Sequence, residues 1–472
     1  MGGQTEAATV NVPSDGAGPD GALWSGRFSK PAAHEAHRLG VSLHFDTRLL
    51  SQDLKSSAAH VEALLDGGLV TDEEATSLLD ALRDEGAWVD VVAASDDEDV
   101  HMAVERELTE RLGEAGAKIH AGRSRNDLVV TDYRLWLLEE AARARANLAA
   151  LVRALVERGR EGAEHVMPGY THNRPAQVVT AGYVMAAHAV ALLRDIERLD
   201  QWATRASVSP LGAAAFATST LGIDPSKTAE RLGFAKSFDN AMDAVSDRDY
   251  AVEFCAVAAI LGVHLSRLAA DLARWSEPAF GFIEVDEAFS TGSSMMPQKR
   301  NPDVLELARG KSARLAGDLV TLITLTSGLP SGYHRDLQED KEPGFDAVET
   351  VNLVLPALSG CVATFRFVPE AMREASGNED LYATDLAEAL VVAGVPFREA
   401  HRRTGELLKT LAADGRGLRD LRDEEWVVFG LQGGAALLDP VVSVGARKMA
   451  GGPSPESVRT QLDAVEAKLP AI

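Results

Sequence analysis

One feature constrains the fold of this chain more than any other, a long segment with neither glycine nor proline. Residues 127–158 lack both, and leucine and alanine recur there at helical spacing. At about 1.5 Å per residue, such a helix is on the order of 45 Å long. Comparable patterns follow at 176–207, 244–275, 303–327 and 336–367. Pro343 and Pro356 interrupt the last of them, so a kink is expected there. Helices of this length predict a bundle.

The length of the helical patterns differs between regions of the chain. Residues 23–120 show short helical patterns broken by glycine and aspartate, and the patterns shorten again from about 375 to Leu469. No internal repeat and no strand-rich segment is evident. The prediction is an all-α fold with a disordered tail (1–21), an N-terminal helical domain (22–122), a central long-helix bundle (123–374) and a C-terminal helical domain (375–472). The apolar faces of the long helices exceed what one chain can cover, so we expect a symmetric oligomer.

Composition limits the classes of partner and the cellular location. The 472 residues carry a net charge of −24, which disfavours nucleic acid and anionic membrane surfaces as partners. The first residues lack a basic start and an apolar segment, so no signal peptide is expected, and no segment reads as long and charge-free enough to span a bilayer. Cys255 and Cys361 read as buried small hydrophobes, which fits a reducing cytoplasm. No His/Cys cluster has metal-ligand spacing, and neither metal nor cofactor is expected.

Residues 291–303, Thr-Gly-Ser-Ser-Met-Met-Pro-Gln-Lys-Arg-Asn-Pro-Asp, combine hydroxyls, a cation and a helix start. Asn301 reads as the N-cap of a helix that has proline at its first position. A flexible loop with Ser293 and Lys299 then ends at a helix N-terminus, where the positive potential favours an anion. Such a loop suits abstraction of a proton beside a carboxylate. The alternative is a Gly-Ser surface loop with an ordinary helix cap.

The same loop resembles the signature of the fumarase/aspartase superfamily, Gly-Ser-Ser-x-Met-Pro-x-Lys-x-Asn. Within that superfamily, five further blocks resemble the argininosuccinate lyase family, and they occur in the family's order at residues 23–28, 120–127, 167–172, 243–249 and 336–341. The resemblance implies a five-helix bundle between two small helical domains. It also implies a homotetramer in which three chains build each active site. The implied reaction splits argininosuccinate into arginine and fumarate.

The resemblance implies catalytic roles for four residues. Ser293 aligns with the base that removes the Cβ proton, with Lys299 stabilising both the serine oxyanion and the charge that develops on the substrate carboxylate. Asn301 positions that carboxylate. His172 aligns with the acid that assists the leaving nitrogen, and Glu306 is its carboxylate partner. The alternative for Glu306 is a surface-facing carboxylate on a helix.

Further residues are implied to bind the substrate. Thr171 contacts it beside His172, although Thr171 also reads as the cap of a helix starting near Ala176, with His172 as an ordinary loop histidine. Arg125 and Asn126 contact the succinyl carboxylates, and their alternative is a helix N-terminal cluster capped by Asn126 or Ser124. The arginine half of the substrate and its carboxylate are held by Tyr333, Gln338 and Lys341. Ser42, within residues 41–46, aligns with a substrate-binding serine.

Basic residues fall inside these blocks, at Arg123, Arg125, Lys299, Arg300 and Lys341. Together they can form a basic pocket in an acidic molecule, whereas each one alone reads as a solvated surface charge.

The sequence departs from the family's usual pattern beside the catalytic set. The family usually has Leu-Gln-x-Ala-Gln where residues 173–177 read Asn-Arg-Pro-Ala-Gln, and glutamine, asparagine and glycine where this chain has Leu128, His334 and Ser56. These changes bear on the amine half of the substrate more than on the reaction. Three hypotheses stand: cleavage of argininosuccinate, release of fumarate from another N-succinyl amine, and an inactive crystallin-like structural protein.

Overall fold

The computed structural model describes residues 33–469, which form two compact units. The first unit holds the described residues up to Asp132 together with Pro210–Leu232, and the second holds Tyr133–Ser209 and the described residues from Gly233 onward. The disordered tail expected at 1–21 and the motif block at 23–28 lie outside the described residues. The domain boundaries expected at 122 and 374 stay predictions.

The first unit is built from short helices, as expected. The amphipathic helix α3 supplies much of its buried surface and packs against α4 and α6. A capping box begins α4, where the Thr71 hydroxyl accepts from the Glu74 N–H and the Glu74 carboxylate accepts from the Thr71 N–H. The helices are α1 (His34–Gly40), α2 (Leu43–Asp46), η1 (Thr47–Leu49), α3 (Leu50–Asp66), α4 (Asp72–Arg83), α5 (Glu85–Ala93), α6 (Val100–Leu112), α7 (Glu114–Ala117), η2 (Lys118–His120) and α10 (Pro225–Arg231).

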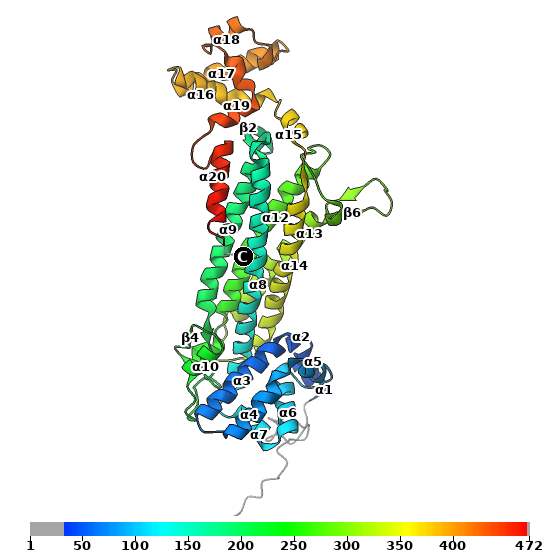
Figure 1. The fold of residues 1–472 in the computed structure, drawn as a ribbon, viewed down its shortest axis with the longest axis vertical. Helices are drawn as coiled ribbons and strands as arrows, with labels where there is room; N and C mark the ends of the chain where they lie inside the picture. Colours follow the sequence, from blue (N-terminus) through cyan, green and yellow to red (C-terminus); the bar gives the residue numbers. More distant parts are fainter. Residues whose placement is uncertain (1–32, 470–472) are drawn as a thin grey trace, which may run out of the picture. The chain divides into compact units, whose positions relative to one another are not determined.

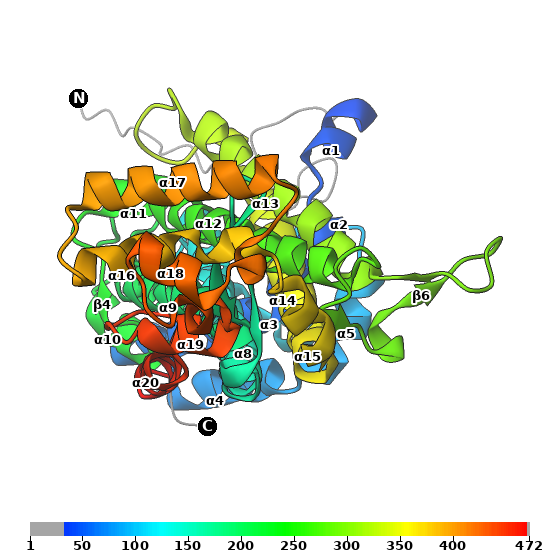
Figure 2. The same ribbon diagram turned by 90° about the horizontal axis from the view of Figure 1, so that it is seen from above.

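Long helices dominate the second unit, which confirms the predicted bundle. They are α8 (Arg125–Glu161), α9 (Ala181–Ala206), α12 (Asp249–Ser276), α13 (Asp303–Thr326) and α14 (Lys341–Thr364), and they run alongside one another (Figures 1 and 2). Close helix contacts depend on glycine at two points. A Cβ on Gly262 of α12 would lie 2.9 Å from Leu315 of α13, and a Cβ on Gly344 of α14 would lie 1.8 Å from the Tyr133 hydroxyl of α8. The short α11 (Ala241–Ser246) precedes α12.

The strands are short and paired, and the longest pair corrects a prediction. A helix was expected from 176, but β1 (Val166–Thr171) and β2 (Arg174–Thr180) form an antiparallel hairpin there. Helix α9 begins only after Thr180, whose hydroxyl accepts from the Tyr183 N–H at 3.2 Å. The expectation of no strand-rich segment is therefore wrong for this stretch. The other pairs are β3 (Val208–Ser209) with β4 (Lys236–Ser237), β5 (Ile283–Glu284) with β8 (Arg366–Phe367), and β6 (Thr291–Gly292) with β7 (Arg300–Asn301).

After residue 368 the fold returns to short helices, as the sequence predicts. They comprise α15 (Pro369–Ala375), η6 (Glu379–Tyr382), α16 (Ala383–Val392), α17 (Phe397–Ala413), α18 (Asp423–Phe429), α19 (Pro440–Ala446) and α20 (Pro455–Glu466). A buried cluster that includes Leu386, Leu411 and Trp426 forms their core, and Val178 of the hairpin belongs to it. Helix α20 packs along α9 instead.

Helix α14 departs from expectation at its start. A 3₁₀ helix, η5, occupies Arg335–Asp340, so α14 begins at Lys341 and not at 336. Pro343 thus lies in the first turn, where its missing N–H would have no partner within the helix in any case. Pro356 lies inside the helix.

Two stretches are long and apolar enough, by length and composition, to cross a bilayer. They are Asp249–Ser276 and Arg335–Thr364, which contradicts the expectation that no segment meets those two criteria. In each stretch, half of the apolar 18-residue segment is buried within the protein, as in the core helices of soluble proteins. Cys255 and Cys361, one on each of these stretches, are free and buried, as predicted.

Candidate active site

His172 lies at the tip of the β1–β2 hairpin. His172 and Asn173 both adopt left-handed backbone conformations, with φ of 52° and 59°, and form the two-residue turn between the strands. Both side chains are exposed. Arg274, near the end of α12, donates to the Asn173 Oδ1 at 3.3 Å and stacks over the ring of Tyr170. Thr171 does not cap a helix, because it closes strand β1 and pairs with Arg174.

The signature loop is a second hairpin, closed by the pairing of β6 with β7. It extends away from the bundle helices (Figures 1 and 2). The Ser293 Oγ accepts from the backbone N–H groups of Met296 at 3.0 Å and Met295 at 3.3 Å. The expected helix cap is wrong by one residue: α13 begins at Asp303 with Pro302 at the N-cap, and Asn301 pairs with Thr291 in the sheet. Two backbone dipoles therefore point at the serine oxygen, while Lys299 is exposed on the same loop.

Glu306 lies in the first turn of α13 and is exposed. It lines a pocket of about 630 Å³ together with Arg274, Arg300 and Arg309. Arg274 also contacts the hairpin that carries His172. His172, the signature loop and Glu306 therefore belong to the same end of the bundle within one chain.

Arg125 and Asn126 begin α8 in the first unit. The Ser124 hydroxyl accepts from the Asn126 N–H at 3.2 Å, so Ser124 caps the helix. This agrees with the alternative interpretation of the block as a capped helix N-terminus. The Asn126 amide donates to the carbonyl of Ala215 at 3.0 Å, and Arg125 pairs with Asp99 at 3.3 Å. Both side chains keep part of their surface exposed. A cap and a binding role are compatible at this position.

Asp127, the last residue of the same block, has a structural role that sequence reasoning missed. Its carboxylate accepts from the backbone N–H groups of Ser124, Gly212 and Ala214 at 2.8–3.0 Å. Burial nevertheless raises the pKa of Asp127 to about 6, because three hydrogen bonds only partly offset the desolvation of the carboxylate. Asp127 thus fastens the start of α8 to the loop at 210–214.

Ser42 is buried in the first unit, between α1 and α2. Its hydroxyl donates to Asp46 at 2.6 Å, and Asp46 in turn accepts from the Val100 N–H at 3.1 Å. The backbone N–H of Ser42 donates to the carbonyl of Glu98 at 2.8 Å. Ser42 therefore holds the segment that leads into α6, where Asp99 pairs with Arg125.

Lys341 is buried, so the alternative interpretation as a solvated surface charge is wrong for this residue. Its ammonium donates to the Asp340 carboxylate at 2.9 Å and to the carbonyl of Leu337 at 3.3 Å. Tyr333, shortly before η5, and Gln338, within it, are half-buried. Arg123 is also buried and donates to Ser57 at 2.9 Å, so the surface alternative is wrong for it as well. Arg300, in contrast, is exposed and pairs with Glu287.

Within one chain, Lys341 and the signature loop lie at opposite ends of α14. Lys341 is the first residue of α14. The signature loop lies near the other end of this helix, because Arg366, which follows α14, pairs in a strand with Glu284, which shortly precedes the loop. A helix of 24 residues is on the order of 35 Å long, which exceeds the length of any small substrate. Residues from different copies of the chain must therefore meet if all of them are to contact one ligand.

One cluster of possible metal ligands occurs among the described residues, although the sequence predicted none. Asp53, His101 and Asp132 are buried with their ligand atoms within 4.8 Å of one another. The His101 Nδ1 lies 2.6 Å from Asp53 and 3.3 Å from Asp132. These are hydrogen-bond distances, and they suit an imidazolium held by two carboxylates. Burial disfavours that charge, but the bonds to Asp132 and Asp53 outweigh it and raise the pKa of His101. The three residues are far apart in the chain, so no local spacing signals the cluster.

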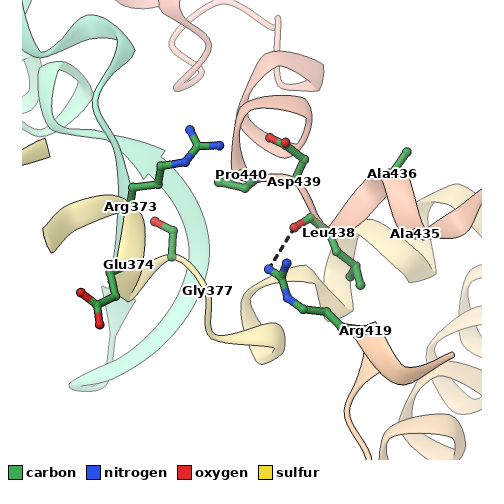
Figure 3. A pocket seen from close by; sticks show the side chains of 10 residues that line it. Arg373, Glu374, Gly377, Arg419, Ala435, Ala436, Leu438, Asp439 and Pro440 are labelled. Carbon is green, nitrogen blue, oxygen red and sulfur yellow. Dashed lines mark hydrogen bonds between the residues drawn. The ribbon is translucent and has the colours of Figure 1, made fainter. Parts of the chain in front are cut away.

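A second pocket, of about 670 Å³, lies among the C-terminal helices and contains none of the predicted site residues (Figure 3). Two of its polar side chains already have partners: Arg419 donates to the carbonyl of Leu438 at 3.3 Å, and Asp439 caps α19 by accepting from the Val441 N–H at 2.7 Å. The residues predicted to be catalytic lie instead on the β1–β2 hairpin, on the signature loop and in the first turn of α13.

Comparison with known proteins identifies the family. A lyase family model matches residues 26–317, and a model of the argininosuccinate lyase C-terminal region matches 380–444. Argininosuccinate lyases from Frankia casuarinae and Mycobacteroides abscessus are 46% and 45% identical to the chain, over 95% of it and over 98% and 97% of their own lengths.

Solved structures agree on the fold. An EDDS lyase in complex with formate is 28% identical, with a TM-score of 0.82 over 90% of this chain and 86% of its own. A class II fumarase from Schistosoma mansoni, at 15% identity, shares the fold with a TM-score of 0.71 over 87% of this chain and 94% of its own. The all-α, fumarase/aspartase-like fold is thereby confirmed, and the chain belongs to the argininosuccinate lyase family.

Proposed function

We propose that the protein cleaves argininosuccinate into arginine and fumarate by β-elimination. The observation that carries the proposal is the Ser293 oxygen, which accepts two backbone N–H groups on a loop that also carries a lysine. Close relatives over nearly the whole chain are argininosuccinate lyases.

Ser293 is the proposed general base. A serine hydroxyl is a weak base unless its oxyanion is stabilised, and the N–H groups of Met295 and Met296 point at that oxygen. Lys299 adds positive charge when the loop closes over the substrate, and Asn301 holds the carboxylate beside the reacting carbon. After the Cβ proton is removed, the same donors stabilise the negative charge that spreads into this carboxylate.

His172 is the proposed general acid, which protonates the nitrogen of the departing guanidino group as the C–N bond breaks. The imidazole suits this step, because an ordinary histidine titrates near neutrality. Glu306 is its proposed carboxylate partner, and Thr171 contacts the substrate beside it. The tip of a tight hairpin holds the imidazole outward, where a neighbouring chain can bring substrate to it.

The remaining side chains are proposed to bind the two halves of the substrate. Arg125 and Asn126, with Ser42, hold the succinyl carboxylates, since a guanidinium pairs with a carboxylate through two parallel hydrogen bonds. The arginine half contacts Tyr333, Gln338 and Lys341.

A homotetramer is proposed because one chain cannot bring these groups together. Large apolar side chains are exposed on the bundle helices, including Val263 of α12 at 58%, Val320 of α13 at 62% and Leu353 of α14 at 56%. Burying them between copies would stabilise the assembly and would build each active site from three chains. The enzyme would act on a small molecule in the cytoplasm, in arginine biosynthesis, without metal, cofactor, nucleic acid or membrane.

A second candidate is the release of fumarate from another N-succinyl amine. The likeness to EDDS lyase and the changes at Leu128 and His334 favour it. The presence of Ser293, His172, Lys299 and Glu306 argues against an inactive structural protein.

One experiment separates these functions. Purified protein is incubated with argininosuccinate, and fumarate is followed by its ultraviolet absorbance while arginine is measured independently. Equal amounts of both products are expected. Release of fumarate from another N-succinyl amine, but not from argininosuccinate, would replace the first proposal by the second, and no release from either would favour the structural protein.

A further inference from the structure

Three charged side chains are buried together where η5 meets α14. Asp340 is fully buried, and one of its carboxylate oxygens accepts from the Lys341 ammonium at 2.9 Å. The other oxygen accepts from the Nε of Arg248, the residue that precedes α12. Lys341 and Arg248 are themselves only 3% exposed. A single carboxylate is thus shared by two buried cations.

The charges of this cluster do not cancel. Two cations face one anion, so the three side chains carry a net charge of +1 in an environment of low dielectric constant. Arg248 has further acceptors, since its guanidinium donates to the carbonyls of Asp247 at 2.8 Å and Val245 at 3.3 Å. A buried excess positive charge is costly without a compensating group, and a ligand carboxylate would supply that group.

Lys341 is the member that is able to meet such a ligand. An ammonium has three N–H donors, and the described residues provide two acceptors, Asp340 and the carbonyl of Leu337. One N–H donor of the ammonium is left for a ligand carboxylate. Half-buried Tyr333 and Gln338 lie in the same segment.

The position of Asp340 is itself fixed by the bundle. Its backbone carbonyl accepts from the Tyr133 hydroxyl of α8 at 3.0 Å. The Tyr133 side chain packs against Gly344, where no larger residue fits. The Asp340 carboxylate is therefore a fixed acceptor for the ammonium at the end of the flexible Lys341 side chain.

We propose that Asp340 is a positioning residue, whose carboxylate, shared with Arg248, fixes the Lys341 ammonium where the α-carboxylate of the substrate's amino-acid half binds. The inference rests on the proposed function and assigns a task in it to a residue that would not touch the substrate.

The test compares substitutions at Asp340 and Lys341 by steady-state kinetics with argininosuccinate. In Asp340→Asn, KM should rise at least ~10-fold while kcat changes less than threefold, because a charged hydrogen bond to the bound substrate is weakened and the reacting carbon is remote. In a Lys341→Met background, the same substitution should change KM less than threefold. A KM within threefold of the unaltered protein, or a full effect without Lys341, would overturn the proposal.

Asp195→Asn is the matched control. Asp195 is also a fully buried carboxylate shared between two basic side chains, Arg198 at 2.7 Å and His264 at 2.6 Å, but it contacts no predicted site residue. Its KM should stay within threefold of the unaltered protein, and an increase equal to that of Asp340→Asn would overturn the proposal by showing a general effect of buried charge.

Two further measurements keep the proposal testable. If Asp340→Asn does not fold, Asp340→Glu retains the charge but moves it, and its KM should still rise at least ~5-fold; an unchanged KM would overturn the proposal. If the unaltered protein releases no fumarate from argininosuccinate, the proposed function fails, and a crystal structure of Asp340→Asn then decides the inference. Lys341 should leave the carbonyl of Leu337 in that structure, and an unmoved ammonium would refute its positioning by Asp340.

Discussion

Replacing Ser293 by alanine removes the proposed base and little else. The side chain is half-buried, and its oxygen only accepts from the N–H groups of Met295 and Met296 within its own loop. The local cost of losing these bonds is about 1 kcal/mol. Because the loop extends away from the bundle helices, the melting temperature should change little (Figure 1).

The expected effect on catalysis is much larger. A positioned general base contributes roughly 10²–10⁴-fold to the rate. The alanine variant should therefore lose at least ~100-fold in kcat, which corresponds to about 2.7 kcal/mol of transition-state stabilisation. KM should change far less, since the proposed contacts of Lys299 and Asn301 with the substrate carboxylate are retained.

The assay is the steady-state release of fumarate from argininosuccinate, with circular dichroism and thermal melting to confirm the fold. Ser294→Ala is the matched control, because Ser294 is the neighbouring exposed serine on the same loop. It should keep kcat within about threefold of the unaltered protein. Near-normal turnover in Ser293→Ala, or equal losses in both variants, would remove Ser293 from its proposed role.

Three other predictions address assembly, packing and pH. His172→Asn and Lys341→Met variants, each with little activity alone at low argininosuccinate concentration, should regain part of the fumarate-releasing activity when mixed and reassembled, because the two residues would reach one site from different chains; no recovery would contradict shared sites. Gly344→Ala should destabilise the fold by about 1–3 kcal/mol or more in chemical denaturation, since its Cβ would lie 1.8 Å from the Tyr133 hydroxyl, and unchanged stability would refute that packing. Burial, with repulsion from a second carboxylate on α14, raises the pKa of Asp318 from 3.8 to about 7. This group binds a proton more readily in the folded state, so the stability it contributes is lost as pH rises from 3.8 to about 7. Asp318→Asn should therefore raise the melting temperature more at about pH 8 than at about pH 5.5, and an equal change at both would contradict the shift.

The long helices were predictable because their signal is local. Residues 127–158 contain the helical spacing and no breaker, and α8 covers them from Arg125 to Glu161. The β1–β2 hairpin was missed because its turn depends on left-handed conformations at His172 and Asn173, which are not glycine. Val178, Val179 and Thr180 are β-branched and were the available signal for strand β2.

The sequence indicated which residues to consider for the site, but not how the folded chain arranges them. The loop sequence identified Ser293, yet the hairpin pairing of Thr291 with Asn301 moved the helix start to Asp303. Asp340, the partner of Lys341, also pairs with Arg248, which lies 92 residues earlier in the chain. No local pattern encodes such a contact, because it exists only after the helices have packed.

The central claim is that Ser293 and His172 act on one substrate from opposite sides. The most direct test is a structure of the assembled Ser293→Ala variant with argininosuccinate bound. It should place the position-293 side chain near the Cβ of the succinyl group and the His172 imidazole near the guanidino nitrogen that leaves, with more than one chain around the ligand. A ligand contacted by only one of these two residues, with every chain of the assembly considered, would contradict the account.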